Sequence, residues 1–326
     1  MYQTRCEKMR PWNFVLLIRR FLLAVRDTII YELSVNELVC GTNDAPASRY
    51  ATLPKRAFVL FWAQDILVKN MVKRANHCNK VVDNMAQTIR IHNIGNYMLR
   101  SYLLETPQGW IALDSGYAGG FEAYKKRLTK LTPLDQVKFV FLTHSHNDHA
   151  GFLRELLAES GARLVAHENS LPRLASGKDA MPEGTGFTTR IGVALSAMMK
   201  HSSFPPVVPD ETAIILKSEA DQPFLASGLP IRVVFLPGHT ADSIGLFLEE
   251  TRELLCGDAA GNAVIAPARQ AILIENVPEF ARSWDKIIAL NPSRIYPSHG
   301  NPFAAEDLVK YRNRLNDLKL FFPKKN

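Results

Sequence analysis

Apolar residues between positions 97 and 166 recur with the two-residue period of strands and the longer period of helices. Two alternating runs are separated by Pro107-Gln-Gly109, which favours a tight turn, so we expect a β-hairpin. The continuous apolar run that follows indicates a buried strand. The predicted elements are strands at 97–106 and 110–113, a helix at 120–131, a strand at 137–143, a helix at 152–159 and a strand at 163–166.

The C-terminal half repeats this alternation. Its predicted elements are strands at 211–217, 231–236, 243–249 and 253–256, followed by helices at 278–290 and 303–321. Strands interleaved with helices at this density indicate an α/β (α+β) fold with both sheet faces covered. A chain of 326 residues, 47% of them hydrophobic, is long enough to bury a sizeable core.

A long segment at 169–210 joins the two halves and exceeds the usual length of a connection between strands. Its large apolar residues have helical spacing, so we expect a helical cap. Methionine and phenylalanine fill irregular gaps well, and we therefore assign these residues to the core of the cap rather than to a substrate pocket. They are Met181, Phe187, Met198, Met199 and Phe204.

The first 84 residues have a different pattern. An apolar stripe from Phe14 to Ile29 lies opposite three arginines and predicts a basic amphipathic helix, and a second helical stretch follows it. Most of the net charge of +7 belongs to this region. We therefore divide the chain into a helical, basic extension at 1–84 and a catalytic domain at 85–326.

Residues 12–31 of the extension have two interpretations. An amphipathic helix usually docks on the body of its own protein, which we favour; the alternative is a peripheral membrane contact through the arginines. A third interpretation is that the extension is only an upstream start before Met85. No apolar run is long enough to span a bilayer, and the four cysteines lack disulfide or metal spacing. We therefore expect a cytoplasmic protein, with a membrane-peripheral one as the alternative.

Three histidines and an aspartate stand within six residues, directly after the strand predicted at 137–143: His144, His146, Asp148 and His149. Zinc is bound by imidazole nitrogen and carboxylate oxygen at roughly 2.0 to 2.2 Å, so its ligands must converge from a small patch of backbone. His144 and His146 lie on the same side of an extended strand end. Asp148 and His149 follow as the chain turns, so this one turn can face two ions.

Three further candidate ligands each follow an apolar β-type run and stand beside a glycine: His239, Asp258 and His299. A lone strand-end histidine or aspartate is more often structural. In this order behind the cluster, however, they complete a ligand set. Cys256 lies two residues before Asp258, and we expect it to pack in the core rather than to face the metals.

Together with Asp114 in Leu113-Asp-Ser-Gly116, these motifs resemble those of the metallo-β-lactamase fold hydrolases, over residues 87–322. The resemblance implies a four-layer αββα sandwich with the metals at one rim of its two sheets. Asp114 is then a support residue for the loop of the cluster. The resemblance also implies one ion held by His144, His146 and His239, a second held by Asp148, His149 and His299, and Asp258 as the bridge.

The implied pair of adjacent divalent ions leads us to predict a hydrolytic reaction. Such a pair, about 3.5 to 4 Å apart, lowers the pKa of a bound water to about 7, so that hydroxide attacks without a serine or cysteine nucleophile. Asp148 and Asp258 are the catalytic carboxylates of this scheme. Zn²⁺ suits the five imidazoles and two carboxylates best, and Fe and Mn are compatible. Redox members of the family have a carboxylate where His146 stands, so the resemblance favours hydrolysis.

The substrate class follows mainly from exclusions. Too few residues follow His299 for the helical C-terminal domain of the family's glutathione-thioester hydrolases. The catalytic part has almost no charge surplus, so we expect no nucleic acid. We therefore expect a small-molecule ester, thioester or lactone as substrate. The alternatives are a mononuclear iron persulfide dioxygenase-like enzyme, a phosphodiesterase or β-lactamase of this fold, and a non-catalytic metal-stabilised scaffold. Tyr117 and Asn262 are candidate donors to a developing oxyanion.

Overall fold

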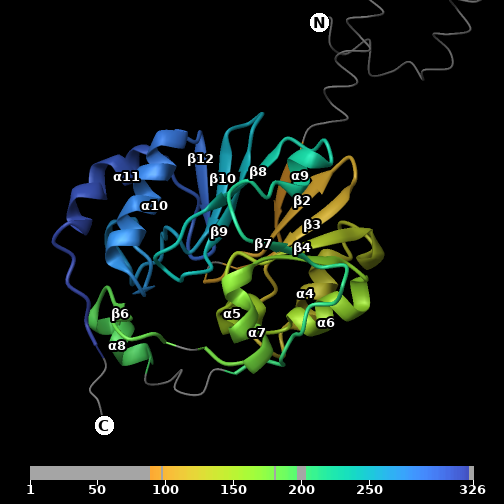
Figure 1. Ribbon diagram of the computed structural model, residues 1–326, viewed down its shortest axis with the longest axis horizontal. Coiled ribbons are helices and arrows are strands. Elements are labelled where there is room, and N and C mark those ends of the chain that lie inside the picture. The colour runs from red at the N-terminus through yellow and green to blue at the C-terminus, as the bar shows by residue number, and fades with distance from the viewer. Residues whose placement is uncertain (1–88, 97, 180, 197–202, 323–326) are drawn as a thin grey trace, which may run out of the picture. The chain divides into compact units, whose positions relative to one another are not determined.

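The structure is a computed structural model that describes residues 89–96, 98–179, 181–196 and 203–322 (Figure 1). The chain separates into two units, Met1–Lys80 and Val81–Asn326, and every described residue belongs to the second. The helices predicted within residues 1–84, including the stretch at 12–31, lie outside the described residues, so the extension stays a prediction.

The first sheet has six strands in the order β1-β2-β3-β4-β5-β7. These strands are β1 Arg90–Asn93, β2 Tyr102–Thr106, β3 Gly109–Leu113, β4 Val137–Phe141, β5 Arg163–His167 and β7 Ile214–Leu216. β2 and β3 form the predicted hairpin, and β1, which the pattern did not reveal, pairs antiparallel with β2. From β3 to β7 the strands are parallel, because helices connect most of them.

The second sheet has four strands in the order β12-β10-β9-β8. These strands are β8 Ile231–Phe235, β9 Ile244–Leu248, β10 Glu253–Gly257 and β12 Arg294–Pro297. β10 and β12 are parallel, and the other pairs are antiparallel. A separate pair consists of β6, Gly186–Phe187, and β11, Leu273–Ile274.

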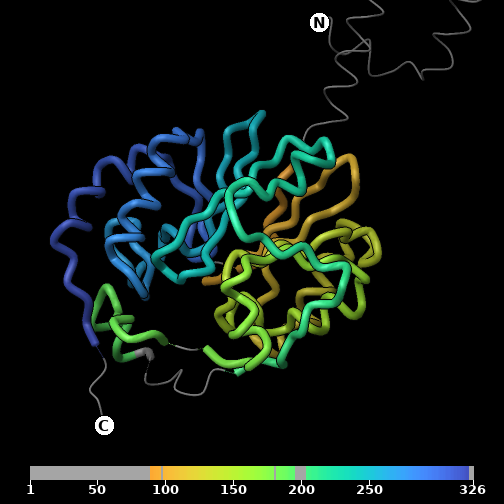
Figure 2. The backbone as a smooth tube through the Cα atoms, in the orientation of Figure 1, coloured from red at the N-terminus to blue at the C-terminus, as the bar shows by residue number. Residues whose placement is uncertain are grey.

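Helices cover the outer faces of both sheets (Figures 1 and 2). Those on the side of the first sheet are α4 Phe121–Leu128, α5 Asn147–Ala150, α6 Leu153–Ser160 and α7 Leu171–Ser176. On the side of the second sheet lie α10 Val277–Leu290 and α11 Glu306–Tyr311, whereas α8 Arg190–Ser196 packs beside β6 and α9 Pro223–Ala226 packs beside β8. None of the helices in these ranges is both long and apolar enough to cross a bilayer.

Three buried clusters fill the spaces between the layers. Val140 and Leu103 of the first sheet pack against Leu156 of α6 in the first cluster. The second cluster joins the two sheets, with Phe141 from one and Leu246 from the other. A third cluster places Trp284 of α10 against the outer face of the second sheet. Three apolar layers between four layers of secondary structure make the αββα sandwich that the resemblance implied.

The helix predicted at 303–321 is wrong in length. α11 ends at Tyr311, a 3₁₀ turn spans Arg312–Leu315, and the chain then becomes extended. The N–H of Phe321 donates to Phe187 O at 2.8 Å, and the N–H of Phe187 donates back to Phe321 O at 2.8 Å. This pairing with a distant strand outweighs the local periodicity.

The described residues of the segment at 169–210 form two short helices, α7 and α8, and the two-residue strand β6, and these described parts are not a continuous helical layer. Phe187 and Phe204 are buried, as expected of residues that pack, whereas Met181 is 53% exposed. Met198 and Met199 lie outside the described residues. Helix α7 of this segment contacts the site, because its Arg173 pairs with Asp242 and Glu275.

Candidate metal centre

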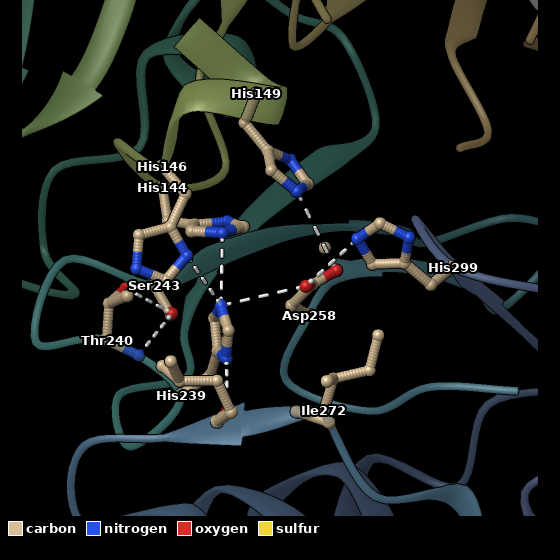
Figure 3. A network of polar contacts seen from close by, with 12 residues as sticks. His144, His146, His149, His239, Thr240, Ser243, Asp258, Ile272 and His299 are labelled. Carbon is tan, nitrogen blue, oxygen red and sulfur yellow. Dashed lines mark hydrogen bonds and ion pairs between the residues drawn. The ribbon is translucent and has the colours of Figure 1, made fainter. Parts of the chain in front are cut away.

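Loops at the ends of strands from both sheets bring together seven side chains of the types that bind metals, and Figure 3 labels all of them except Asp148. His144 and His146 follow β4, and the short helix α5 then presents Asp148 and His149. His239, Asp258 and His299 follow β8, β10 and β12 of the second sheet. All seven residues that the sequence predicted as ligands therefore meet at one edge of the sandwich.

Three imidazoles form the first half of the site. His239 Nε2 lies 3.1 Å from His144 Nε2 and 3.1 Å from His146 Nδ1. A tetrahedral ion that binds nitrogen at about 2.0 to 2.1 Å separates its ligand atoms by about 3.3 Å. The three nitrogens thus have nearly the spacing that one ion requires. We call His144, His146 and His239 the three-histidine half.

The second half combines carboxylates with imidazoles. His299 Nε2 lies 3.2 Å from Asp148 Oδ2 and 3.4 Å from Asp258 Oδ2. His149 Nε2 is 3.7 Å from Asp148 Oδ2. Asp258 also reaches the first half, because its Oδ2 is 3.6 Å from His239 Nε2. The position of Asp258 between the halves is the one that a bridging ligand needs.

Protein groups fix which ring nitrogen faces the centre. Nδ1 of His239 donates to Leu273 O at 2.6 Å, and Nδ1 of His299 donates to Met98 O at 2.6 Å. A carbonyl oxygen can only accept, so Nδ1 carries the proton and Nε2 presents its lone pair to the centre. This is how metal-binding histidines are usually oriented.

Asp114 supports the loop of the cluster. Its carboxylate accepts hydrogen bonds from Thr143 N at 2.7 Å, from Thr143 Oγ1 at 2.8 Å and from His149 Nδ1 at 2.8 Å. The Thr143 hydroxyl also lies 3.1 Å from His144 Nδ1. Asp114 has a φ of 59°, a left-handed conformation that aspartate tolerates. It thereby contacts His149 directly and His144 through Thr143.

Gly257 is required by the close approach of β10 to this loop. Its φ is 56°, and a Cβ atom there would lie 2.8 Å from Thr143 Cβ. Any larger residue would push Asp258 away from the cluster.

Two buried atoms of the centre have no hydrogen-bond partner among the described residues: His149 Nε2 and Asp258 Oδ1. They are 3.9 Å apart, which is too far for a hydrogen bond. A buried polar atom without a partner costs about 1–3 kcal/mol. One divalent cation between them would satisfy both, so the donor set fits bound metal.

The two halves differ in charge. Burial, followed by the neighbouring imidazole of His239, lowers the pKa of His146 to about 3. Burial alone would lower the pKa of His149 as well, but the carboxylates of Asp148 and Asp114 raise it to about 9. Burial opposes ionisation of Asp258, yet His299 and His149 hold the pKa of its carboxyl well below the usual range. Burial thus keeps His144 and His146 neutral, whereas Asp148, His149 and Asp258 form an array of opposite charges.

Tyr117 and Asn262 both lie near the centre. Tyr117 is half-exposed, and burial followed by the carboxylates of Asp148 and Asp258 raises the pKa of its hydroxyl. Asn262 donates from Nδ2 to Asn301 O at 2.8 Å, and its Oδ1 accepts from Arg269. The amide of Asn262 is therefore already bonded to protein, whereas the Tyr117 hydroxyl forms no hydrogen bond with any other described residue.

Cys256 packs in the core, as expected. It is buried in the cluster beneath the second sheet, and its Sγ lies 3.8 Å from Tyr296 O. Burial raises the pKa of its thiol to about 12. Of the remaining histidines, His92 pairs with Glu105 and His167 accepts a hydrogen bond from Asn169 N, while His201 lies outside the described residues.

Sequence reasoning missed a buried polar group beside the three-histidine half. Asp242 accepts hydrogen bonds from Ser145, and Arg173 of α7 pairs with both Asp242 and Glu275. The only signal in the sequence is an aspartate three residues after His239, which has no periodic pattern. Its partners are too distant in the chain to be found from spacing.

Comparison with known proteins agrees with this architecture. The sequence model described as "Metallo-beta-lactamase superfamily" matches residues 97–299, which is more than half of the chain. Over 204 residues the chain is 25% identical to "Probable metallo-hydrolase YflN" of Bacillus subtilis, covering 56% of this chain and 73% of the relative. It is 24% identical to "Beta-lactamase-like protein 2 homolog" of Caenorhabditis elegans, covering 64% of this chain and 59% of that protein.

Solved structures show the same fold. A metallo-beta-lactamase of Cronobacter sakazakii superposes with a TM-score of 0.52 at 20% identity, covering 70% of this chain and 88% of its own. Rm3 metallo-beta-lactamase superposes with a TM-score of 0.51 at 17% identity, covering 70% and 90%. The match of the sequence model and the shared fold lead to one conclusion. The chain belongs to the metallo-β-lactamase superfamily.

Proposed function

We propose that this protein is a metal-dependent hydrolase that uses two divalent ions, most simply Zn²⁺, on a small ester, thioester or lactone. The observation that carries the proposal is the convergence of seven histidine and aspartate side chains in three groups, the middle one sharing a residue with each of the others, with His149 Nε2 and Asp258 Oδ1 buried and without a hydrogen-bond partner among the described residues. The name of the relative YflN, a probable metallo-hydrolase, is consistent with this reaction class.

The ions would supply Lewis-acid polarisation of an electrophile and a water of lowered pKa. The protein's own residues do the rest. His144, His146 and His239 would hold one ion through nitrogens 3.1 Å apart. Asp148, His149 and His299 would hold the second, and Asp258 would keep the two at a fixed separation. Such preorganised groups need no rearrangement when charge develops on the substrate.

The identity of residue 146 supports hydrolysis. His146 presents an imidazole nitrogen to His239, and burial holds its pKa at about 3, so the ring is neutral and available as a ligand at pH 7. An ion held by neutral imidazoles keeps more of its positive charge than one held by carboxylates. That charge favours polarisation of a carbonyl oxygen, which is the step that hydrolysis needs.

The surroundings of the centre support an uncharged substrate. A small pocket beside Asp258 and His299 is lined by alanines, a glycine, Gln270 and Ile272. Figure 3 shows Ile272 beside Asp258. Within the described residues, the nearby Arg173 and Arg269 are each paired with aspartate or glutamate. Neither is therefore available to bind a phosphate or a carboxylate of a substrate.

We further propose that the Tyr117 hydroxyl donates a hydrogen bond to the oxygen on which negative charge develops. Burial, followed by the carboxylates of Asp148 and Asp258, raises the pKa of this hydroxyl, so it stays protonated at neutral pH and can donate. Loss of one such donor costs about 10²–10³ in kcat. Tyr117→Phe should therefore lower kcat with little change in metal content, and unchanged kcat would exclude this role.

The decisive experiment measures metal content and hydrolysis on the same preparation. Elemental analysis of the protein should give two equivalents of divalent metal. A panel of chromogenic ester, thioester, lactone, β-lactam and phosphodiester substrates should show turnover of one of the first three classes. Two bound metals without turnover of any substrate would favour a scaffold, and one iron with oxygen consumption would favour a persulfide dioxygenase-like enzyme.

Two variants test the assignment of residues. His146→Ala and Asp258→Ala should each abolish turnover while the circular dichroism spectrum stays unchanged. The matched controls are His92→Ala and Asp285→Ala, which remove a histidine bonded to Glu105 and an aspartate paired with Arg312 at the surface. Full activity in either site variant would contradict the assignment, and full activity is expected in both controls.

A further inference from the structure

A buried network of charged side chains lies beside the three-histidine half but contains none of its ligands. Asp242 is 1% exposed, and its Oδ2 accepts from Ser145 N at 2.9 Å and from Ser145 Oγ at 2.6 Å. Arg173 on α7 donates from Nη1 to Asp242 Oδ1 at 3.2 Å and from Nη2 to Glu275. Burying three charged groups is costly unless each is paired, as they are here.

The network contacts the backbone around all three histidines. Ser145 stands between His144 and His146, so its two hydrogen bonds to Asp242 fix the direction of the chain on either side. Glu275 accepts from Ala241 N at 3.1 Å, two residues after His239. The N–H of Glu275 also donates to His239 O at 3.1 Å.

The other half of the centre has different supports. Asp114 bonds to His149, and Met98 O accepts from His299. Within the described residues, neither Asp242 nor Glu275 forms a hydrogen bond with Asp148, His149 or His299. A change at Asp242 therefore acts on the three-histidine half, where Asp114 also reaches His144 through Thr143.

We infer that Asp242, acting through Ser145 and held by Arg173, is the positioning residue of the three-histidine half. This inference rests on the proposed metal centre and adds to it a link from α7, in the segment at 169–210, to one ion only. Outer partners of metal ligands typically contribute about 10–100-fold in metal affinity. Loss of Asp242 should lower the metal affinity of the three-histidine half by this factor and leave the metal affinity of the other half nearly unchanged.

The test is a titration of the metal-free full chain with Zn²⁺ against a chelating indicator, which gives two dissociation constants. A parallel titration with Co²⁺ follows the visible absorption of each half. Asp242→Ala should raise one dissociation constant about 10–100-fold and change one set of Co²⁺ bands. Asp242→Asn, which keeps one acceptor oxygen, should give a smaller increase at the same half.

Ser145→Ala removes only the hydroxyl and keeps the backbone bond, so it decides the question if Asp242→Ala does not fold. Like Asp242→Ala, it should raise the dissociation constant for Zn²⁺ of the three-histidine half. Asp285→Ala, at the surface, is the control and should change neither constant.

Two outcomes separate the inference from the proposal on which it rests. Failure of the unchanged protein to bind Zn²⁺ would overturn the metal centre itself. Two tightly bound ions in the unchanged protein, with equal weakening of both halves or of neither in the Asp242 and Ser145 variants, would overturn the inference and leave the centre standing.

Discussion

Replacement of Asp114 by asparagine tests how the loop of the cluster is supported. Asp114 has a φ of 59°, and asparagine tolerates this conformation about as well as aspartate, so the change adds no backbone strain. The carboxylate accepts three hydrogen bonds, two from Thr143 and one from His149 Nδ1. An amide of the same shape has only one oxygen with which to accept them.

The expected cost follows from the two orientations of that amide. Its NH₂ group must face either the Thr143 N–H or the His149 Nδ1–H, so one buried donor loses its acceptor at a cost of about 1–3 kcal/mol. In the first orientation the bond to His149 survives, but it loses the charge of the carboxylate and about half its strength. We expect Asp114→Asn to lower the free energy of unfolding of the metal-free protein by about 2–3 kcal/mol.

Urea unfolding in the presence of a chelator, followed by circular dichroism, measures this loss. The midpoint should fall with an unchanged slope, because the change affects stability and not the surface exposed on unfolding. Metal titration should show about 10–100-fold weaker binding at the half that contains His149. The control is Asp285→Asn, at a surface pair with Arg312, which should change stability by less than about 0.5 kcal/mol. Equal stability and equal metal affinity of the two variants would refute the reasoning.

Three further predictions concern the backbone and the ions. Gly257→Ala should lower the free energy of unfolding by about 1–3 kcal/mol and remove most of the bound metal. The reason is that its Cβ would lie 2.8 Å from Thr143 Cβ at a φ of 56°. Normal metal content would contradict this prediction. Ala268→Gly should raise the free energy of unfolding by up to about 1 kcal/mol, because Ala268 has a φ of 57° that glycine adopts without strain. A lower urea midpoint would show that this strain is absent. Zn²⁺ at 100 times its dissociation constant should stabilise the fold by about 2.7 kcal/mol, so a chelator should lower the Tm, and an unchanged Tm would mean that no ion binds.

Periodicity predicted those elements whose local pattern and packing agree. The strand at 137–143 appears as β4, two residues shorter, and the helix at 152–159 appears as α6, shifted by one residue. β1 has polar residues at three of its four positions, Arg90, His92 and Asn93, and its strand form depends on pairing with β2. Such pairing is a property of the tertiary structure and leaves no local pattern.

Those candidate ligands that stand close together in the sequence, or next to a glycine in a turn, could be predicted from the sequence. The cluster from His144 to His149 needs only one tight turn to face two halves, and spacing alone revealed it. The positioning network was not predictable, because Asp242 pairs with Arg173 across 69 residues and Glu275 with Arg173 across 102. Nothing in the pattern of a single sequence distinguishes these charges from solvent-exposed ones.

Contacts between the sheets, rather than either sheet alone, set the geometry of the centre. The cluster of four ligands follows a strand of the first sheet, whereas His239, Asp258 and His299 follow strands of the second. Polar bonds cross between them: Tyr102 Oη donates to Pro297 O at 3.0 Å, and Arg100 N donates to Ser298 O at 2.8 Å, next to His299. Because the apolar layer between the sheets has no directional preference, these bonds fix its register. Metal affinity therefore reports how the two sheets pack, and a substitution in that layer should weaken binding even where it touches no ligand.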